Sequence, residues 1–374
     1  MTKVLVFGYY GDKNLGDEIL LQGILTSFKL ENPSLDVTIL SKNPKLTSER
    51  FNIKSTNAPR KNKYLLKFIR EISKTDIFIL GGGGLIQDFI GIKQLFYWIS
   101  SLLIAKIFRK KTMLYSIGVG PLGTKQSRIV TRFFLKFADL ITVRDEGSAD
   151  LLLEIGVRKD KIFVTADPAF VLNPEIKKNK ISIRENSIGI SFLPYFNIVN
   201  NNSMESELEL NFIKFINQLI ETQGYNVYLI PLHNLEGETH DLGAAKRILA
   251  GIKNKEKILL LDEDLTPTEA LNIFGEFEIF VGVRLHSLIM SAINNVPFVS
   301  INYHPKVESF IKLVNQERYS LNINNVTDEE LMEKFLLLKE NKQNEIKTIK
   351  NEFQQLRKKS LSTQTLLRNF INKD

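Results

Sequence analysis

A guanidinium and an imidazole stand two residues apart in the segment Gly282–Ser287, directly after an apolar run that predicts a strand. Arginine binds carboxylates and phosphates through paired hydrogen bonds, and histidine exchanges protons near neutral pH. On extended backbone Arg284 and His286 project to the same side, which favours anion binding combined with acid–base chemistry. The alternative interpretation of His286 is a buried structural histidine.

Other chemistry-bearing residues follow neighbouring predicted strands of the same half. His233 comes after the strand predicted at Val227–Ile230 and is a weaker catalytic candidate than His286. Lys306, in the segment Tyr303-His304-Pro305-Lys306, is a candidate phosphate ligand.

The N-terminal half has a glycine-rich segment from Gly8 to Glu18, after a strand predicted at Val4–Phe7. Glycines let backbone approach a ligand closely, and the N-terminus of the following helix offers N–H groups to an anion. The spacing is neither that of a dinucleotide-binding fingerprint nor that of a P-loop, so it gives little support to a nucleotide site. Asp17 is either a functional carboxylate or a helix N-terminal charge that complements the dipole.

A second glycine-rich segment, Gly81–Gly84, follows a buried strand predicted at Asp76–Leu80 and precedes Gln87 and Asp88. Four consecutive glycines cost more chain entropy than a tight turn requires. We therefore expect a loop on which a ligand lies closely. Arg144 ends another predicted strand, Leu140–Val143. It has two interpretations of equal weight: an anion ligand, or a partner of Asp145 or Glu146.

The elements that position these residues alternate short β-branched runs with helical periods, which predicts parallel sheets covered by helices. Lysine-rich residues 173–186 form a predicted linker, after which the alternation restarts. The sequence thus predicts an α/β protein with two Rossmann-like domains facing a cleft. The domains are expected at 1–172 and 187–327, followed by charged C-terminal helices at 328–374.

Composition excludes several classes of protein and site. The 374 residues are 43% hydrophobic and 25% charged, which is typical of a folded chain rather than a disordered or collagen-like one. No cysteine is present, which excludes a disulfide scaffold, a thiolate zinc site and a cysteine nucleophile. The four histidines are too scattered to predict a metal site. The net charge of +8 is mild, and its distribution does not favour nucleic acid as a partner.

Two features concern location. A strand predicted from Lys3 leaves no room for a signal peptide, and the uncharged stretch 94–105 is too short to span a bilayer. We therefore expect a cytoplasmic protein. The helix around Trp98 is predicted to be a core helix. The alternative is an interfacial helix whose basic flank, Arg109–Lys111, contacts anionic lipid.

Taken together and in this order, the motifs resemble the polysaccharide pyruvyl transferase family, most of all its branch that acts on secondary cell wall polymers. The resemblance covers roughly Val4 to Phe310. It rests on Gly8-Tyr9-Tyr10-Gly11 with Gly16-Asp17-Glu18, Gly81–Asp88, Ser116–Pro121, Val143–Ser148, Ala166–Ala169, Arg284–His286, Val296-Pro297 and Tyr303–Val307. His304 stands where many relatives have Asp.

The resemblance implies transfer of the enolpyruvyl group of phosphoenolpyruvate onto two hydroxyls of one sugar as a ketal, with release of phosphate. His286 is then the expected general acid, and Asp17 the expected group that binds or deprotonates the acceptor. The expected donor-binding residues are Arg144, Arg284, Leu285 and Lys306. The expected acceptor-binding residues are Gly16, Gly82, Gly83, Gly84, Gln87, Asp88 and His233.

The resemblance further implies N-acetylmannosamine in a cell-surface polysaccharide precursor as the acceptor, and neither a metal nor a cofactor. A lipid-linked acceptor would bring the protein to the inner face of the membrane, where the Trp98 helix and the basic C-terminal residues would contact it. Two other functions stay open: a nucleotide-sugar glycosyltransferase, and a non-catalytic sugar-binding protein of polymer assembly.

Overall fold

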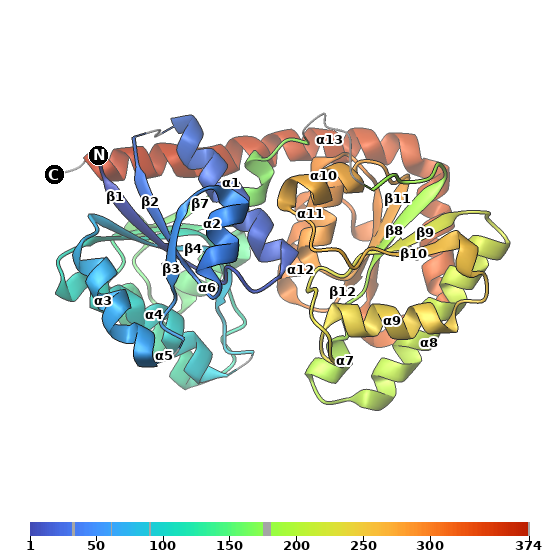
Figure 1. Ribbon diagram of the computed structural model, residues 1–374, viewed down its shortest axis with the longest axis horizontal. Coiled ribbons are helices and arrows are strands. Elements are labelled where there is room, and N and C mark those ends of the chain that lie inside the picture. The colour runs from blue at the N-terminus through green and yellow to red at the C-terminus, as the bar shows by residue number, and fades with distance from the viewer. Residues whose placement is uncertain (32–33, 61, 90, 175–180, 373–374) are drawn as a thin grey trace. The chain divides into compact units, whose positions relative to one another are not determined.

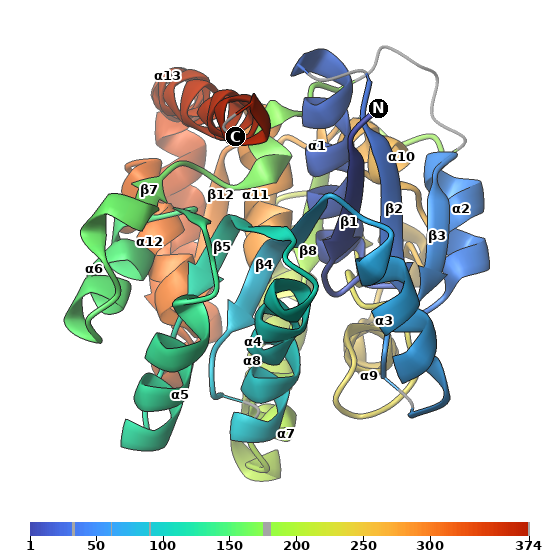
Figure 2. The same ribbon diagram turned by 90° about the vertical axis from the view of Figure 1, so that its left-hand side faces the viewer.

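The computed structural model describes residues 1–31, 34–60, 62–89, 91–174 and 181–372. The chain divides into two compact units, of which the first comprises residues 1–12, 17–172 and 355–374, and the second residues 13–16 and 173–354. Each unit holds one parallel sheet between helices (Figures 1 and 2). The predicted α/β fold with two Rossmann-like domains is confirmed.

The first sheet has seven strands in the order β3-β2-β1-β4-β5-β6-β7, and every pair of neighbours is parallel. The strands are β1 (Lys3–Phe7), β2 (Asp36–Ser41), β3 (Lys54–Asn57), β4 (Ile77–Ile86), β5 (Lys111–Val119), β6 (Leu140–Val143) and β7 (Ile162–Val164). The helices are α1 (Leu15–Glu31), α2 (Pro44–Phe51), α3 (Leu65–Ser73), α4 (Ile92–Ile107), α5 (Lys125–Leu135) and α6 (Glu146–Glu154).

The second sheet has six strands in the order β10-β9-β8-β11-β12-β13, again all parallel. The strands are β8 (Ser187–Ser191), β9 (Asn226–Leu229), β10 (Ile258–Leu260), β11 (Ile279–Gly282), β12 (Phe298–Asn302) and β13 (Ser320–Asn322). The helices are α7 (Tyr195–Ile198), α8 (Asn202–Glu221), α9 (Asp241–Gly251), α10 (Pro267–Phe274), α11 (Leu285–Ile293), α12 (Pro305–Leu313) and α13 (Asp328–Asn372).

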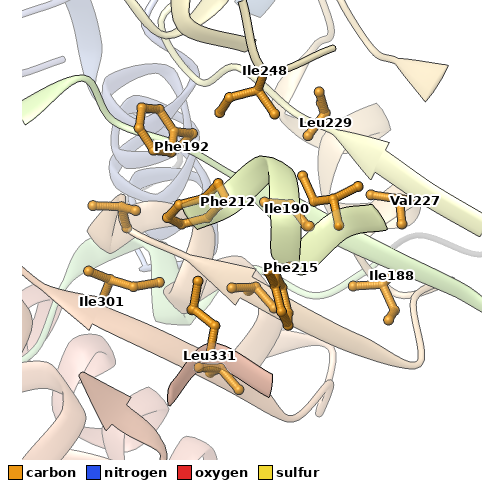
Figure 3. Packing of buried hydrophobic residues seen from close by; sticks show 14 of the residues in the cluster. Ile188, Ile190, Phe192, Phe212, Phe215, Val227, Leu229, Ile248, Ile301 and Leu331 are labelled. Atoms are coloured by element: carbon orange, nitrogen blue, oxygen red, sulfur yellow. The ribbon is translucent and has the colours of Figure 1, made fainter. Parts of the chain in front are cut away.

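Apolar side chains on both faces of each sheet make the cores. In the second unit, Ile188 and Ile190 of β8 pack under Phe212 and Phe215 of α8 (Figure 3). Phe192 and Phe212 meet edge to face with ring centroids 4.8 Å apart. Because central strands of a parallel sheet are buried on both faces, they are near-continuously apolar, which is why their positions were predictable.

The strand order reverses at one point in each sheet, between β1 and β4 in the first and between β8 and β11 in the second. Connections leave in opposite directions at such a point, so the carboxyl ends of the two strands open a crevice where ligands of α/β proteins bind. Residues after β1, β4, β8 and β11 are therefore the first places to look for a site.

The C-terminal region corrects one prediction. Residues 328–372 form one continuous helix, α13, rather than several. Its residues up to Gln354 belong to the second unit, where Leu331 and Phe335 enter the core, and its residues from Gln355 belong to the first unit, where Leu367 does so. The predicted linker, 173–186, lies partly outside the described residues.

Candidate functional site

The switch point of the second sheet is marked by an ion pair between Arg284, directly after β11, and Asp241, at the start of α9. The Arg284 Nε lies 2.9 Å from Asp241 Oδ2 and 3.2 Å from Oδ1, and Nη2 also donates to this carboxylate. Asp241 is completely buried, whereas the Arg284 side chain is 21% exposed. The buried carboxylate therefore holds the guanidinium in a fixed position, while part of the Arg284 side chain still faces solvent.

The same carboxylate holds the loop that follows β9. Asp241 Oδ2 accepts hydrogen bonds from the backbone N–H groups of Leu232 at 3.2 Å and His233 at 3.1 Å. Asp241 thus ties together the ends of β9 and β11. The sequence did not single out Asp241, because an acidic residue at the start of a helix is usually interpreted as a charge that complements the helix dipole.

His286 lies in the first turn of α11. The expectation that Arg284 and His286 share a side of extended backbone is wrong, because Leu285 already begins the helix and successive helical residues turn around its axis. Arg284 instead points to Asp241. His286 packs against Gly16, where an added Cβ would lie only 2.6 Å from the imidazole Nδ1.

Gly16 reaches this position because Lys13–Gly16 belongs to the second unit. The Leu15 N–H donates to the Leu232 carbonyl at 2.8 Å, and Asn14 forms an antiparallel bridge with His233. The glycine was expected to bind the acceptor. The contact gives a packing reason for glycine at this position, because a side chain there would displace the His286 ring.

The structure brings His233 and His286 to the same carboxyl edge of the second sheet, after β9 and β11. The His233 ring packs against His240, with centroids 4.8 Å apart. Leu285 has a buried side chain, so any contact it makes with a donor must come from its backbone at the start of α11.

Lys306 follows β12 in the first turn of α12. Its Nζ lies 5.4 Å from the centre of the Tyr303 ring, a cation–π contact that holds the ammonium near the strand end. Its backbone N–H donates to His304 Nδ1 at 3.2 Å, which makes His304 the N-cap of α12. Asp is also a favoured N-cap residue, so an aspartate at this position could cap α12 in the same way.

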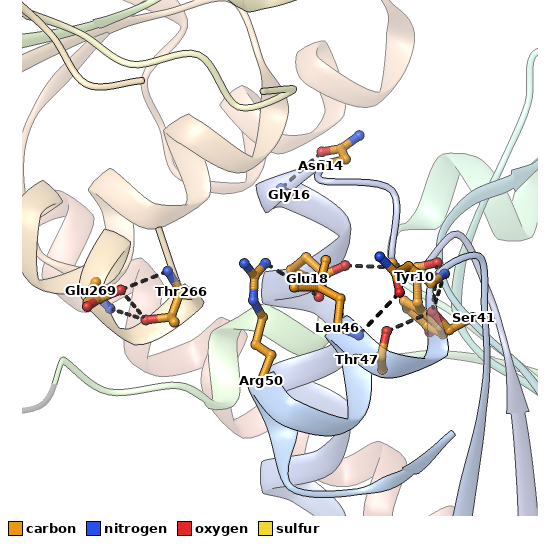
Figure 4. A network of polar contacts seen from close by, with 12 residues as sticks. Tyr10, Asn14, Gly16, Glu18, Ser41, Leu46, Thr47, Arg50, Thr266 and Glu269 are labelled. Carbon is orange, nitrogen blue, oxygen red and sulfur yellow. Dashed lines mark hydrogen bonds and ion pairs between the residues drawn. The ribbon is translucent and has the colours of Figure 1, made fainter. Parts of the chain in front are cut away.

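In the first unit the turn after β1 is held by its own side chains (Figure 4). The Tyr10 hydroxyl donates to the Gly81 carbonyl, and Glu18 accepts the Gly11 N–H at 2.8 Å. A Cβ at Gly8 would lie 2.5 Å from the Tyr10 ring, and one at Gly11 would lie 2.1 Å from Ser41 Oγ. Internal packing therefore accounts for these two glycines without a ligand.

The expected glycine loop at Gly81–Gly84 is wrong in its secondary structure, because strand β4 continues through it to Ile86. Gly82 and Gly83 have positive φ angles of 71° and 81°, which interrupt the regular extended backbone of β4. The register of β4 with β5 shifts after Gly83. A Cβ at Gly83 would lie 3.6 Å from Asp17 Oδ1. The structure thus brings Asp17 and Gly83 together at the first switch point.

Of the residues after Gly83, Gly84 has open space around its backbone, whereas Asp88 has a structural role. At Gly84 an added Cβ would meet nothing closer than Gln87 Nε2, at 3.9 Å, so the backbone is open there. Asp88 accepts backbone N–H groups from Gly123 at 3.0 Å and Thr124 at 3.1 Å. Burial would raise the pKa of Asp88, but these hydrogen bonds outweigh it and lower the pKa. Holding the chain before α5 is a structural reason for Asp88.

Arg144 is buried after β6 and lies between two carboxylates. Its Nε is 3.4 Å from Asp145 Oδ2 and its Nη1 is 3.5 Å from Asp167 Oδ2. A Cβ at Gly118 would lie 2.6 Å from Arg144 Nη2, so the guanidinium lies flat on that glycine. Arg144 thus pairs with Asp145, one of the two partners that the sequence offered, and with Asp167, which the sequence did not suggest.

The helix around Trp98 is α4, which packs into the core through Trp98 but also exposes Ile92, Phe96 and Ile107 to solvent. Trp98 is 2% exposed and packs on Phe7 with ring centroids 4.8 Å apart. Within the described parts of the chain, every helix is too short or too polar to cross a bilayer.

Comparisons with known proteins agree with this architecture. The amylovoran biosynthesis protein AmsJ of Erwinia amylovora is 23% identical over an alignment of length 384, which covers 89% of this chain and 91% of AmsJ. A structure of S. aureus MnaA with UDP superposes with a TM-score of 0.70 at 12% identity, covering 99% of this chain and 96% of the other. A putative UDP-N-acetylglucosamine 2-epimerase from Listeria monocytogenes gives 0.69 at 14% identity, with 100% and 97% covered.

At such identities the two solved structures establish only that the GT-B-like fold is shared. The family is established separately, because a model of polysaccharide pyruvyl transferases matches residues 14–305, which are more than half of the chain and include the second switch point. This chain belongs to the polysaccharide pyruvyl transferase family.

Proposed function

We propose that the protein transfers the enolpyruvyl group of phosphoenolpyruvate onto two hydroxyls of a sugar, forming a ketal and releasing phosphate. Membership of the pyruvyl transferase family supports the class of reaction. The observation that carries the proposal is the arrangement at the second switch point, where Arg284 is anchored by Asp241 and His286 is seated on Gly16.

The donor carries a carboxylate and a phosphate, so its site needs several fixed positive groups. Arg284 and Lys306 follow adjacent strands, β11 and β12, and the N-termini of α11 and α12 add oriented N–H groups. We assign the donor to these groups. Arg144, held by two carboxylates, is proposed as a further donor ligand.

In the proposed reaction His286 donates a proton to the methylene carbon of phosphoenolpyruvate, which creates an oxocarbenium-like centre at the adjacent carbon. A sugar hydroxyl attacks this carbon and gives its proton to a base, for which Asp17 is the candidate. The bond to the phosphate oxygen then breaks, phosphate leaves with the electron pair, and the second hydroxyl closes the ketal. One hydroxyl proton ends on the phosphate, and the other restores the proton that His286 gave to the methyl group.

For the acceptor we propose N-acetylmannosamine in a precursor of a cell-surface polysaccharide, bound by Gly82, Gly83, Gly84, Gln87 and His233. The open backbone at Gly84 and the neighbouring Asp17 and Gly83 support this assignment in the first unit. The proposed location is the cytoplasm, at the inner membrane face when the acceptor is lipid-linked. The reaction consumes phosphoenolpyruvate as co-substrate and requires no cofactor.

The test is phosphate release from phosphoenolpyruvate with and without N-acetylmannosamine-containing acceptors, alongside a binding measurement with UDP. Acceptor-dependent release with negligible UDP affinity supports the proposal. Tight UDP binding without phosphate release would instead support a nucleotide-sugar glycosyltransferase. Carbohydrate binding with neither would indicate a non-catalytic assembly protein.

A further inference from the structure

Helices α4 and α5 lie side by side in the first unit (Figure 2). Both expose large apolar side chains to solvent. Four of them lie at helical spacing, Ile92 and Phe96 on α4 and Ile129 and Phe133 on α5, and their exposed fractions range from 37% for Ile92 to 68% for Ile129. We call this surface the α4–α5 face. Scattered exposed apolar residues are ordinary, but a contiguous group marks an interaction surface.

Ring contacts show that the aromatic members of the face form one group. The Phe134 ring meets Phe96 at 5.3 Å and Phe133 at 5.2 Å between centroids, both edge to face. Phe133 also meets Phe137 at 5.6 Å. The buried Phe134 thus contacts both Phe96 of α4 and Phe133 of α5 and connects the exposed aromatic side chains of the two helices.

Basic residues predominate on the two helices of this face, and the neighbouring carboxylates of Asp139 and Glu154 are paired with Lys106 of α4 and Arg128 of α5. Within their bounds, Ile92–Ile107 and Lys125–Leu135, the two helices contain no acidic residue. Lys93, Lys125, Arg132 and Lys136 are exposed on or just after them. The Lys136 Nζ lies 6.0 Å from the centre of the Phe133 ring, which places a cation directly beside the aromatic group.

We propose that the α4–α5 face binds the surface of an anionic lipid bilayer. Half-exposed aromatic and aliphatic side chains gain free energy when they enter the boundary between headgroups and acyl chains. Flanking cations are drawn to the negative surface potential of anionic lipid, and their long stems let the charge stay in water. Trp98, which faces the core, takes no part in this contact.

A membrane accounts for both properties of the face, whereas other occupants account for one. A nucleic acid would use the cations but not the protruding Ile92 and Ile129. An acidic protein surface would be expected to find some acidic residues on this face to fix its orientation. The inference does not depend on the proposed reaction, because binding to lipid is measured without substrate.

The experiment measures partition of the full chain onto vesicles of phosphatidylcholine and phosphatidylglycerol in equal amounts, and onto pure phosphatidylcholine vesicles. The wild-type chain is expected to bind the mixed vesicles much more tightly, and less tightly as salt is added. Lys93→Gln with Lys136→Gln should weaken partition roughly 25-fold, since each cation at such a surface contributes roughly fivefold. Phe96→Ser with Phe133→Ser should weaken it roughly tenfold or more.

Matched controls separate this face from other surfaces. Lys358→Gln with Lys359→Gln neutralises two exposed cations on α13, and Leu210→Ser with Leu336→Ser removes two exposed leucines of the second unit. Both pairs should leave partition unchanged. All variants should release phosphate normally with a water-soluble acceptor, so that loss of lipid binding is distinguished from failure of the proposed reaction.

Three results would overturn the proposal: equal binding to neutral and mixed vesicles, unchanged partition of the α4–α5 variants, or loss of partition in the α13 pair instead. Because the two lysines are exposed, their replacement does not disturb the core, and the charge variant remains informative even if the aromatic variant fails to fold.

Discussion

At the scale of single residues, Gly16 links the backbone of the glycine-rich segment to the position of His286. An added Cβ would lie 2.6 Å from the imidazole Nδ1 and 3.1 Å from the His286 Cβ, so the whole side chain must shift. Gly16→Ala should therefore lower kcat for phosphate release by about tenfold or more, because small misplacements of an acid are costly. The free energy of unfolding should fall by only about 1–2 kcal/mol, because overpacking costs about 1–3 kcal/mol and the higher helix propensity of alanine offsets part of it.

Steady-state kinetics and thermal unfolding check this pair of outcomes. Gly123→Ala is the control, because the nearest atom to its added Cβ is 3.8 Å away. Normal turnover in Gly16→Ala would show that the position of His286 is unimportant to the reaction.

Asp241 is a positioning residue, which acts on the donor through Arg284. Asp241→Asn keeps an oxygen for the N–H groups of Leu232 and His233 but removes the negative charge that anchors the guanidinium. The KM for phosphoenolpyruvate should rise about tenfold while kcat changes little, because charge-assisted bonds are roughly twice as strong as neutral ones.

Arg284→Ala should raise the same KM by at least as much, and combining it with Asp241→Asn should add little further. Full additivity of the two changes, or an unchanged KM in Asp241→Asn, would separate Asp241 from donor binding.

At the scale of elements, Glu205 connects α8 to the short helix α7. It accepts backbone N–H groups from Phe196 at 2.7 Å and Asn197 at 3.1 Å. Burial nevertheless raises the pKa of Glu205 from 4.5 to about 7. Between these values the folded chain holds a proton that the unfolded chain has released, so the free energy of unfolding falls as pH rises from about 4.5 to 7, by about 3 kcal/mol in all.

Denaturant unfolding of the wild type and Glu205→Gln at pH 5 and pH 8 checks this. The variant should lack the part of the pH dependence that Glu205 causes, whereas Glu207→Gln, at an exposed position of the same helix, should keep it. A variant with the wild-type dependence would contradict the raised pKa.

The strands show which elements could be predicted from the sequence and which could not. Central strands such as β1 and β11 were predicted because their apolar runs are buried on both faces. The edge strands β3, with sequence Lys-Ser-Thr-Asn, and β13 were missed because their polar residues carry no such pattern. Strand β4 was ended too early, since glycines usually weaken a strand and only tertiary packing against β5 carries it to Ile86.

The candidate site was predictable to a similar degree. Arg284, His286 and Lys306 were found because strand ends are where ligands bind in this class of sheet. Their partners were not, because Asp241 and Gly16 are distant in the sequence and come close only through the topology.

At the scale of the whole molecule, α13 contributes to the cores of both units. Leu367 is fully buried in the first unit, beside a hydrogen bond from Gln364 to Tyr115 and another from Ser360 to the Asp167 carbonyl at 3.0 Å. Leu367→Ala should lower the free energy of unfolding by about 2–5 kcal/mol, the usual cost of such a cavity.

Denaturant unfolding checks this, with Leu210→Ala, half-exposed on α8, as the control expected to change stability by less than about 0.5 kcal/mol. A Leu367 variant as stable as the control would show that the end of α13 does not stabilise the first unit.

The central claim is that a protein proton is added to the methylene carbon of phosphoenolpyruvate on the way to a sugar ketal. The most direct measurement is the reaction in D2O with an N-acetylmannosamine-containing acceptor, followed by NMR of the product methyl group together with phosphate release. The account predicts one deuterium in each ketal methyl group, one phosphate per ketal, and loss of both signals in His286→Ala. Phosphate release without a deuterated ketal, or wild-type turnover in His286→Ala, would contradict it.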